Sequence, residues 1–258
     1  MTTTTLYSDE GSIDLHVESG VATIRFGHPK SNALPQTLLE SLASTIQHTG
    51  ARDDVRVIVL RSEGQRAFCA GASFDELVAI DNPGDGKEFF LGFARVILAM
   101  IGAPVPIVTA VQGKVAGGGV GLVAASDYAI AVEDASLRLA ELAVGIGPFV
   151  VGPVIEFKIG VGPFGAMALD ADWRDAAWAE RHGLYAQVVP DDEALDAAVH
   201  EHAVELALAN PDAVRAIKRV LWAGTELWAD LLDERAEISG TLVLSDHTRE
   251  AIRKFKKG

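Results

Sequence analysis

The chain has 258 residues, of which 49% are hydrophobic and 22% charged, a composition typical of a globular protein with a large core. Its formal net charge of −14 argues against a general binder of nucleic acid or anionic membranes, because both functions need a dominant basic surface. The single cysteine, Cys69, excludes an internal disulfide. We see no signal peptide and no apolar stretch long enough to cross a bilayer, so we expect a cytoplasmic protein.

Strand-like and helix-like segments alternate through the first half of the chain. Residues 13–17 and 21–26 flank a Glu-Ser-Gly turn and predict a hairpin. A helix is expected after Pro35 and a buried strand over 55–60, and this order predicts a parallel pair of strands. The polar residues 81–86 predict a loop before an apolar helix that covers 89–100. The class indicated is α/β.

A run of glycines gives the first sign of function. Gly117, Gly118 and Gly119 follow a strand expected over 105–111 and precede a small-residue segment that can continue as a helix. Such a run lets a ligand approach backbone N–H groups that could hold a negatively charged oxygen, although it also suits close packing alone. A second small-residue turn, at 69–72, follows the strand at 55–60, and each turn could supply one N–H group to a single oxygen.

Glu141 is the candidate acid or base. Its neighbours on both sides, residues 139–140 and 142–143, are leucine and alanine. A carboxyl group in apolar surroundings tends to have a raised pKa, which suits a base that must also return its proton. The alternative interpretation is a surface glutamate on an amphipathic turn.

Two further patterns do not favour a cofactor or a metal ion. Residues 160–165 match a dinucleotide-binding glycine pattern but contain Pro163 and lack the flanking strands, so we expect a break between helices. His200 and His202 lie two residues apart, so they point to different faces of a helix and indicate a solvated face. We expect no metal site and no separate cofactor. Trp222 and Trp228 are expected to be packing residues.

The character of the chain changes near residue 188. Helices are expected over 191–210 and 211–222, and the chain ends in a basic segment at 253–258. We therefore expect an α/β core over residues 1–190 and a helical C-terminal region over residues 191–258.

Nearly the whole chain resembles the crotonase superfamily, the enoyl-CoA hydratases and isomerases. Three segments carry the resemblance in order: His-Pro-Lys-Ser-Asn-Ala-Leu at 28–34, the small-residue turn within 67–77, and the segment from Ala103 through the glycine run. The resemblance implies a spiral core of ββα units. It also implies a helical C-terminal region that builds homotrimers, often paired into hexamers as dimers of trimers.

The resemblance further implies an acyl-CoA thioester as the substrate, with coenzyme A as part of the substrate. The backbone N–H groups of Ala72 and Gly118 would stabilise its enolate. The other substrate contacts that it suggests are Lys30, Ala70, Gly117, Gly121 and Phe149, together with Phe255 and Lys257 from the C-terminal helix of a neighbouring subunit.

One departure from the family pattern bears on the reaction. Hydratases of the family have two catalytic glutamates; the later one matches Glu141, but the earlier position is Gly121. Single-glutamate 3,2-enoyl-CoA isomerases resemble this pattern more closely, since one base can move a proton from C2 to C4. Isomerisation of a 3-enoyl-CoA to the 2-enoyl form is therefore the leading expectation. A hydratase, a hydrolase or decarboxylase variant, and a non-catalytic acyl-CoA binder stay open.

Overall fold

The computed structural model describes residues 2–8 and 11–255. An antiparallel meander begins it, formed by β1 (Thr2–Ser8), β2 (Gly11–Glu18) and β3 (Val21–Gly27). The expected hairpin is β2–β3, with a turn at Ser19 and Gly20, both of which have positive φ.

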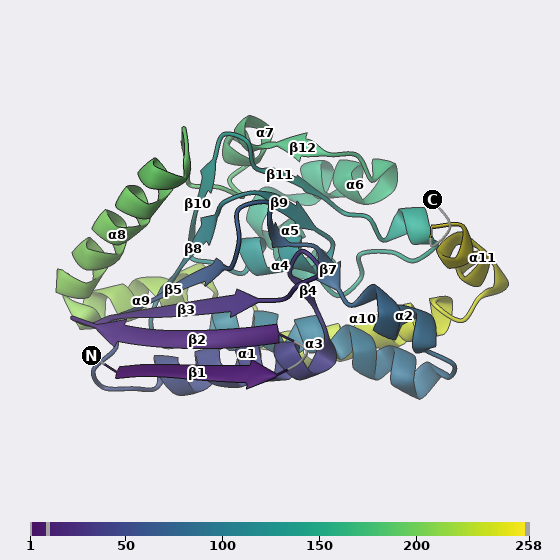
Figure 1. Ribbon diagram of the computed structural model, residues 1–258, viewed down its shortest axis with the longest axis horizontal. Helices are drawn as coiled ribbons and strands as arrows, with labels where there is room; N and C mark the ends of the chain where they lie inside the picture. Colours follow the sequence, from purple (N-terminus) through teal and green to yellow (C-terminus); the bar gives the residue numbers. More distant parts are fainter. Residues whose placement is uncertain (1, 9–10, 256–258) are drawn as a thin grey trace.

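From β3 onward the main sheet is parallel. Its order is β1-β2-β3-β5-β8-β10-β13, where β5 is Val57–Ser62, β8 is Ile107–Val111, β10 is Tyr128–Val132 and β13 is Gln187–Val189. The predicted parallel pair is β3–β5. Strands β5, β8 and β10 are almost wholly buried because helices and loops cover both faces of this part of the sheet (Figure 1).

Short strands form a second sheet, in the order β12-β11-β9-β6. These strands are β6 (Ala67–Cys69), β9 (Lys114–Ala116), β11 (Ser136–Arg138) and β12 (Arg174–Asp175), and a further small pair joins β4 (Ala33–Leu34) to β7 (Gly71–Ala72). Each ββα unit thus gives its first strand to the main sheet and its second to the small one, as in β5–β6, β8–β9 and β10–β11. The expected α/β fold of ββα units is confirmed.

The described residues form eleven α-helices and one 3-10 turn. They are α1 (Gln36–Gly50), α2 (Phe74–Ala79), α3 (Pro83–Gly102), α4 (Gly118–Ala124), the 3-10 turn η1 (Leu142–Val144), α5 (Gly152–Ile159), α6 (Val161–Asp170), α7 (Ala176–Arg181), α8 (Asp192–Leu208), α9 (Pro211–Leu221), α10 (Trp228–Leu242) and α11 (Asp246–Phe255). Within the described residues, no helix is both long and apolar enough to cross a membrane.

The loop predicted over 81–86 is wrong in its second half, because α3 already begins at Pro83. The side chain of Asn82 accepts a hydrogen bond from the backbone N–H of Asp85 (3.0 Å), which caps the helix, and proline suits the first turn. This early start places Gly86 against α10: a β-carbon on Gly86 would lie 2.7 Å from the carbonyl oxygen of Gly240. The two helices can approach closely only because both positions are glycine.

The C-terminal helices are joined to the α/β core by a buried ion pair. Lys218 on α9 donates to Asp127 Oδ2 (2.7 Å) and to the carbonyl of Met100 (2.8 Å), while Trp222 Nε1 donates to Asp127 Oδ1 (2.7 Å). Trp222 and Trp228 are buried packing residues, as predicted. The helical region begins at Asp192, and its division from the core as a separate unit at residue 190 stays a prediction.

Candidate functional site

Three neighbouring strands of the small sheet run parallel and end at the same place. Strands β6, β9 and β11 are followed, two or three residues after each ends, by Ala72, Gly118 and Glu141. Because the carboxyl ends of parallel strands lie at one edge of a sheet, the fold brings together three residues that are far apart in the sequence. The topology therefore answers whether the two small-residue turns meet.

Backbone N–H groups of the two turns line one space. Gly71 (φ +95°) passes so close to the glycine run that a β-carbon on it would lie 3.2 Å from the carbonyl oxygen of Ala116 and 3.7 Å from the nitrogen of Gly118. Ser73 N donates to Leu34 O (3.0 Å). Backbone donors alternate in direction along a strand, so the N–H of Ala72 points away from β4.

The second donor belongs to the first turn of α4. Gly118 is the first residue of this helix, where N–H groups have no partner within the helix. The ring of Phe93 occupies the space that a side chain at Gly118 would need, so only glycine fits here. Gly119 packs against Cys69 instead, which means that the run serves both packing and the site.

Glu141 lies beside these donors. A β-carbon on Gly117, whose φ is +50°, would be 3.2 Å from Oε1 of Glu141. Oε2 of Glu141 is buried and has no hydrogen-bond partner within the described residues. Burial raises the pKa of this carboxyl group to about 7, although nearby backbone hydrogen bonds and the charge of Arg138 act in the opposite direction. Glu141 is a cavity residue rather than a surface glutamate.

The turn that carries Glu141 is held from both sides. The carbonyl of Glu141 accepts hydrogen bonds from the N–H groups of Val144 (3.2 Å) and Ile146 (3.0 Å). The hydroxyl of Thr248, a fully buried residue of α11, donates to the carbonyl of Gly145 (2.8 Å). Sequence reasoning missed Thr248, because nothing in the sequence indicates that the last helix returns to this turn.

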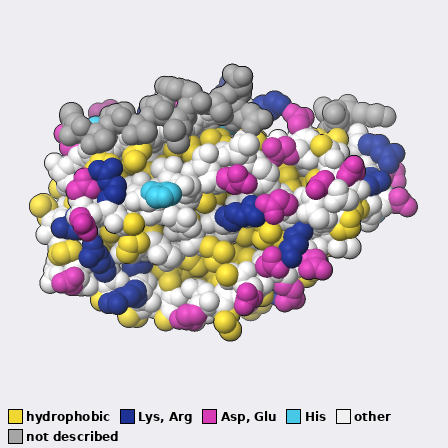
Figure 2. All heavy atoms as spheres, turned by 90° about the horizontal axis from the view of Figure 1, so that it is seen from below, with side chains coloured by type: hydrophobic (Ala, Val, Ile, Leu, Met, Phe, Trp, Pro, Cys, Tyr) yellow, Lys and Arg dark blue, Asp and Glu magenta, His cyan; other side chains and the backbone are white. Residues whose placement is uncertain are grey.

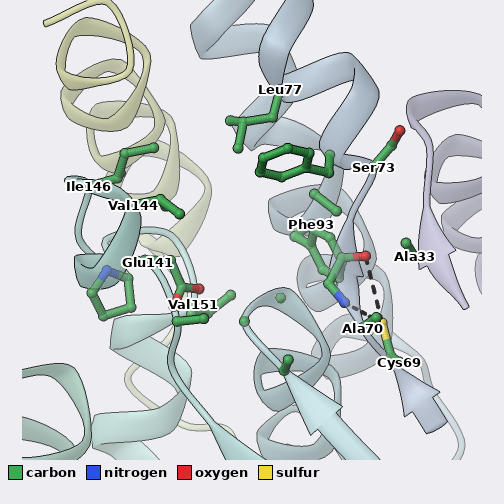
Figure 3. Close-up of a pocket in the computed structure, with 18 of the residues that line it drawn as sticks. Ala33, Cys69, Ala70, Ser73, Leu77, Phe93, Glu141, Val144, Ile146 and Val151 are labelled. Atoms are coloured by element: carbon green, nitrogen blue, oxygen red, sulfur yellow. Dashed lines mark hydrogen bonds between the residues drawn. The ribbon is translucent and has the colours of Figure 1, made fainter. Parts of the chain in front are cut away.

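The cavity has a volume of about 1070 Å³ and is large enough for an extended acyl group. Glu141 and Val151 lie on one side of it, and Ala70, Ser73 and Phe93 on the other (Figure 3). Its apolar wall comes mainly from α2, α3 and the segment after Glu141, and consists of Phe74, Leu77, Phe89, Phe90, Phe93, Val144, Ile146 and Phe149. Phe149 was predicted from the sequence; the other aromatic residues of this wall were not assigned individually.

Gly121 lies behind the cavity wall. It is buried, and it is not among the described residues that line the cavity. A β-carbon on it would be 2.7 Å from Cγ1 of Val151 and 3.2 Å from Cδ1 of Ile97. Val151 itself lines the cavity, so this valine fills the direction in which a side chain at position 121 would point.

Other predicted contacts line the same cavity. Lys30 is there and forms an ion pair with Asp75, and Ala70 and Gly117 also contribute to the wall. The side chain of Phe255 and the whole of Lys257 lie outside the described residues. A coenzyme A contact at these two residues therefore stays a prediction.

The cavity also has a basic wall that the sequence did not predict. Arg66, Lys114, Arg138 and Trp173 line it, on or beside the small sheet. Lys114 and Ala116 occupy alternate positions of β9, and Arg138 is the register partner of Ala116, so Lys114 and Arg138 share the face turned to the cavity. This alternation was readable in the sequence, but the pairing register was not.

The two rejected motifs have other roles. Gly160, at φ +82°, separates α5 from α6, which confirms the predicted helix break. His200 is exposed, as predicted, but His202 packs against Tyr128 with ring centroids 4.1 Å apart, so the predicted solvated face is wrong for His202. No group of three or more potential metal ligands occurs among the described residues.

Comparison with known proteins identifies the family. A family model described as Enoyl-CoA hydratase/isomerase matches residues 16–257. A Rhodobacter capsulatus protein named a probable enoyl-CoA hydratase is 31% identical over 95% of this chain and 94% of its own length. An indene-carboxyl-CoA hydrolase of Mycobacterium tuberculosis is 30% identical over 79% of this chain and 81% of its own. A Rhodococcus jostii hydrolase of the same name aligns over only about half of each protein (48% and 47%), at 36% identity.

Solved structures agree with this assignment. An enoyl-CoA hydratase from Mycobacterium avium superposes with a TM-score of 0.84 at 27% identity, covering 95% of this chain and 96% of that one. One from Bacillus halodurans has a TM-score of 0.87 and covers 94% and 99%, but at 19% identity it shows the fold alone. The chain belongs to the enoyl-CoA hydratase/isomerase family.

Proposed function

We propose that this protein converts a 3-enoyl-CoA thioester to the 2-enoyl form, with Glu141 as its single acid and base. The thioester oxygen would accept hydrogen bonds from the N–H groups of Ala72 and Gly118. One such donor contributes roughly 3–4 kcal/mol to stabilising a developing oxyanion.

The proposed reaction moves one proton and one double bond. Glu141 removes a proton from C2, and the electron pair of the broken C–H bond delocalises through the thioester carbonyl as a dienolate. Glu141 then returns the proton to C4, which leaves the double bond between C2 and C3. Atoms and charge balance, and neither water nor a second carboxyl group takes part.

The observation that carries this proposal is the isolated, buried carboxyl group of Glu141. Its Oε2 has no hydrogen-bond partner among the described residues, and burial raises its pKa to about 7. A base with a pKa near the working pH can accept a proton and release it again within one turnover. The space at Gly121, where family hydratases carry another glutamate, is filled by Val151.

Glu141→Gln tests this role. We expect isomerisation of a 3-enoyl-CoA to fall by about 10²–10⁴-fold, because the amide cannot act as a base. Exchange of the C2 proton with deuterated water should fall in parallel. Glu156→Gln on α5, an exposed position outside the cavity lining, is the matched control and should keep full activity. Unchanged turnover in Glu141→Gln would refute the assignment.

The choice between isomerase and hydratase needs separate substrates. Purified protein is incubated with a 3-enoyl-CoA or with a 2-enoyl-CoA, and the products are separated by chromatography. We expect double-bond migration from the first and little 3-hydroxyacyl-CoA from the second. Formation of 3-hydroxyacyl-CoA at a rate comparable to isomerisation would contradict the isomerase proposal and favour a hydratase.

Hydrolysis is the second candidate, because the relative from Mycobacterium tuberculosis is named a hydrolase. The same two donors could stabilise the oxyanion that forms when water attacks a carbonyl carbon, while Glu141 accepts a proton from that water. A bicyclic diketone thioester of the kind in that name is the diagnostic substrate. A product heavier by one water, formed in the wild type and absent in Glu141→Gln, would favour the hydrolase.

We also propose self-association, in line with the trimers that the family resemblance implies. Helix α9 buries its Lys218 and exposes Ile217, Val220 and Leu221, the reverse of the usual arrangement. Apolar side chains also lie between charged ones on the face of the molecule seen from below (Figure 2). Light scattering should give a molar mass that is a multiple of three times 27.3 kDa. A monomeric mass would contradict this.

A further inference from the structure

The basic wall of the cavity is unusual in this acidic chain. The protein has 36 acidic and 22 basic residues, yet Arg66, Lys114 and Arg138 line the cavity and, among the described residues, have no carboxylate within ion-pair distance. Lys30, by contrast, is paired with Asp75 in the same cavity. Because no carboxylate among the described residues forms an ion pair with these three cations, a negatively charged group of a ligand can take that place.

Arg138 is the clearest case. Its Nε is buried and has no acceptor among the described residues. An unsatisfied buried donor on a charged side chain is energetically costly, so such a group usually has a partner in the working complex. Arg138 lies three residues before Glu141, and its carbonyl accepts a hydrogen bond from the N–H of Gly117 (3.0 Å). The unpaired guanidinium is thus attached to the backbone that forms the site.

Trp173 holds the two sheet cations in place. The guanidinium carbon of Arg138 lies 4.8 Å from the Trp173 ring centroid, and Nζ of Lys114 lies 5.4 Å from it. Cation–π contacts of this kind restrict long side chains before a ligand arrives, which lowers the entropic cost of binding. Arginine in such an arrangement offers a planar fork that matches a carboxylate.

We propose that Arg138 and Lys114, supported by Trp173, bind a carboxylate on the acyl group, so that the substrates are CoA thioesters of dicarboxylic acids. The inference rests on the proposed function for the position of the thioester at Glu141 and the two N–H groups. The phosphates of coenzyme A fit the location less well, because the whole pantetheine arm separates them from the thioester. A carboxylate a few bonds along the acyl chain remains near Glu141.

Equilibrium binding of saturated thioesters tests the proposal without turnover. Glutaryl-CoA and pentanoyl-CoA have acyl chains of equal length, and only the first carries a terminal carboxylate; adipoyl-CoA and hexanoyl-CoA form the next pair. By calorimetry we expect the wild type to bind at least one dicarboxylic member about ten-fold or more tighter than its neutral partner, as a charge-assisted hydrogen bond provides. Arg138→Gln should remove this preference and leave the affinity for the neutral partner and for free coenzyme A unchanged.

Matched variants separate this role from general damage. Arg138→Lys should retain part of the preference, and Lys114→Gln should weaken it. Arg174→Gln is the control, since Arg174 is paired with Asp170 and does not line the cavity. Thermal melting and light scattering accompany each variant to check its fold and its assembly.

Three results would overturn the proposal. In the first, the wild type shows no preference for either dicarboxylic thioester. In the second, Arg138→Gln weakens the binding of all the thioesters and of free coenzyme A equally. In the third, the substitution changes only the oligomeric state. The second would assign the cluster to coenzyme A phosphates, and the third to a carboxylate of another subunit. Failure of the proposed isomerase function is distinguishable, because it would appear in the Glu141→Gln assays and leave the binding preference intact.

Discussion

The contact between Gly121 and Val151 allows a quantitative test of why this chain has only one glutamate at its site. Gly121→Ala would place a methyl group 2.7 Å from Cγ1 of Val151 and 3.2 Å from Cδ1 of Ile97. Carbon atoms in contact prefer about 3.5–4.0 Å, so the new methyl overlaps its neighbour by roughly 1 Å. Overpacking of a core costs about 1–3 kcal/mol, partly offset by about 1 kcal/mol from replacing glycine inside a helix.

We therefore expect Gly121→Ala to lower the free energy of unfolding by up to about 2 kcal/mol, given these two opposing effects. Val151→Ala should cost about 2 kcal/mol through the loss of two buried carbon atoms and the cavity that they leave. In the double variant the new methyl occupies part of that cavity. The double loss should therefore be smaller than the sum of the single losses, by about 1 kcal/mol or more.

Guanidinium chloride denaturation of the four proteins gives this coupling directly. Gly165→Ala is the control: Gly165 is also inside a helix, but a β-carbon on it would meet nothing within 4 Å, so the change should be neutral or slightly stabilising. Losses that add within about 0.5 kcal/mol would show that Val151 does not occupy the direction of the missing side chain.

The functional counterpart combines both positions. Gly121→Glu alone should yield no hydratase activity, because Val151 blocks the added side chain. Gly121→Glu together with Val151→Ala should give measurable 3-hydroxyacyl-CoA from a 2-enoyl-CoA. Activity in the single variant but not in the double one would refute the steric explanation.

Two further predictions concern charged groups. Burial raises the pKa of Glu141 to about 7 from an ordinary 4.5, so between these pH values the folded state binds more protons than the unfolded state and the free energy of unfolding falls as pH rises. Glu141→Gln should therefore have a larger free energy of unfolding than the wild type at pH 8, with the difference closing near pH 5. A difference that does not change with pH in denaturant titrations would contradict the burial of this carboxyl group. Lys218→Met should cost about 3–5 kcal/mol, because the buried carboxylate of Asp127 loses its ion-pair partner. Lys254→Met, which breaks the exposed pair with Glu250, should leave the free energy of unfolding almost unchanged, and equal losses in the two variants would refute the assigned burial.

Much of the fold was readable from local patterns. The hairpin, the strands near 55–60 and 105–111, and the helices after Pro35 and Pro211 follow from alternation, periodicity and proline position. The start of α3 is signalled by Asn82 and Pro83, but the glycines at 84 and 86 favour a loop when the sequence is read locally. Gly86 instead permits close packing against α10, a helix distant in the sequence.

The site was predictable in part. Glycine runs and a glutamate in apolar surroundings indicate oxyanion and base chemistry wherever they meet, so Gly118 and Glu141 could be proposed from the sequence. Whether they meet depends on strand register. The basic wall depends on it entirely, since Arg138 and Lys114 become neighbours only through the pairing of β11 with β9. Val151 could not be linked to Gly121, because the contact depends on how the N-cap residue of α5 packs against α4.

The convergence of three parallel strands has a consequence for how this protein can change. Two of the three groups at their ends are peptide N–H groups, which belong to the backbone and which only a substitution by proline would remove. Position 118 must also stay glycine, because the ring of Phe93 fills the space of a side chain there. Mutation can therefore redirect the chemistry without dismantling its centre. In the proposed mechanism, point changes at positions 121, 138, 141 and 151 would vary the proton carrier, the space for water and the charge accepted on the acyl group, while the two thioester-binding N–H groups would stay in the backbone.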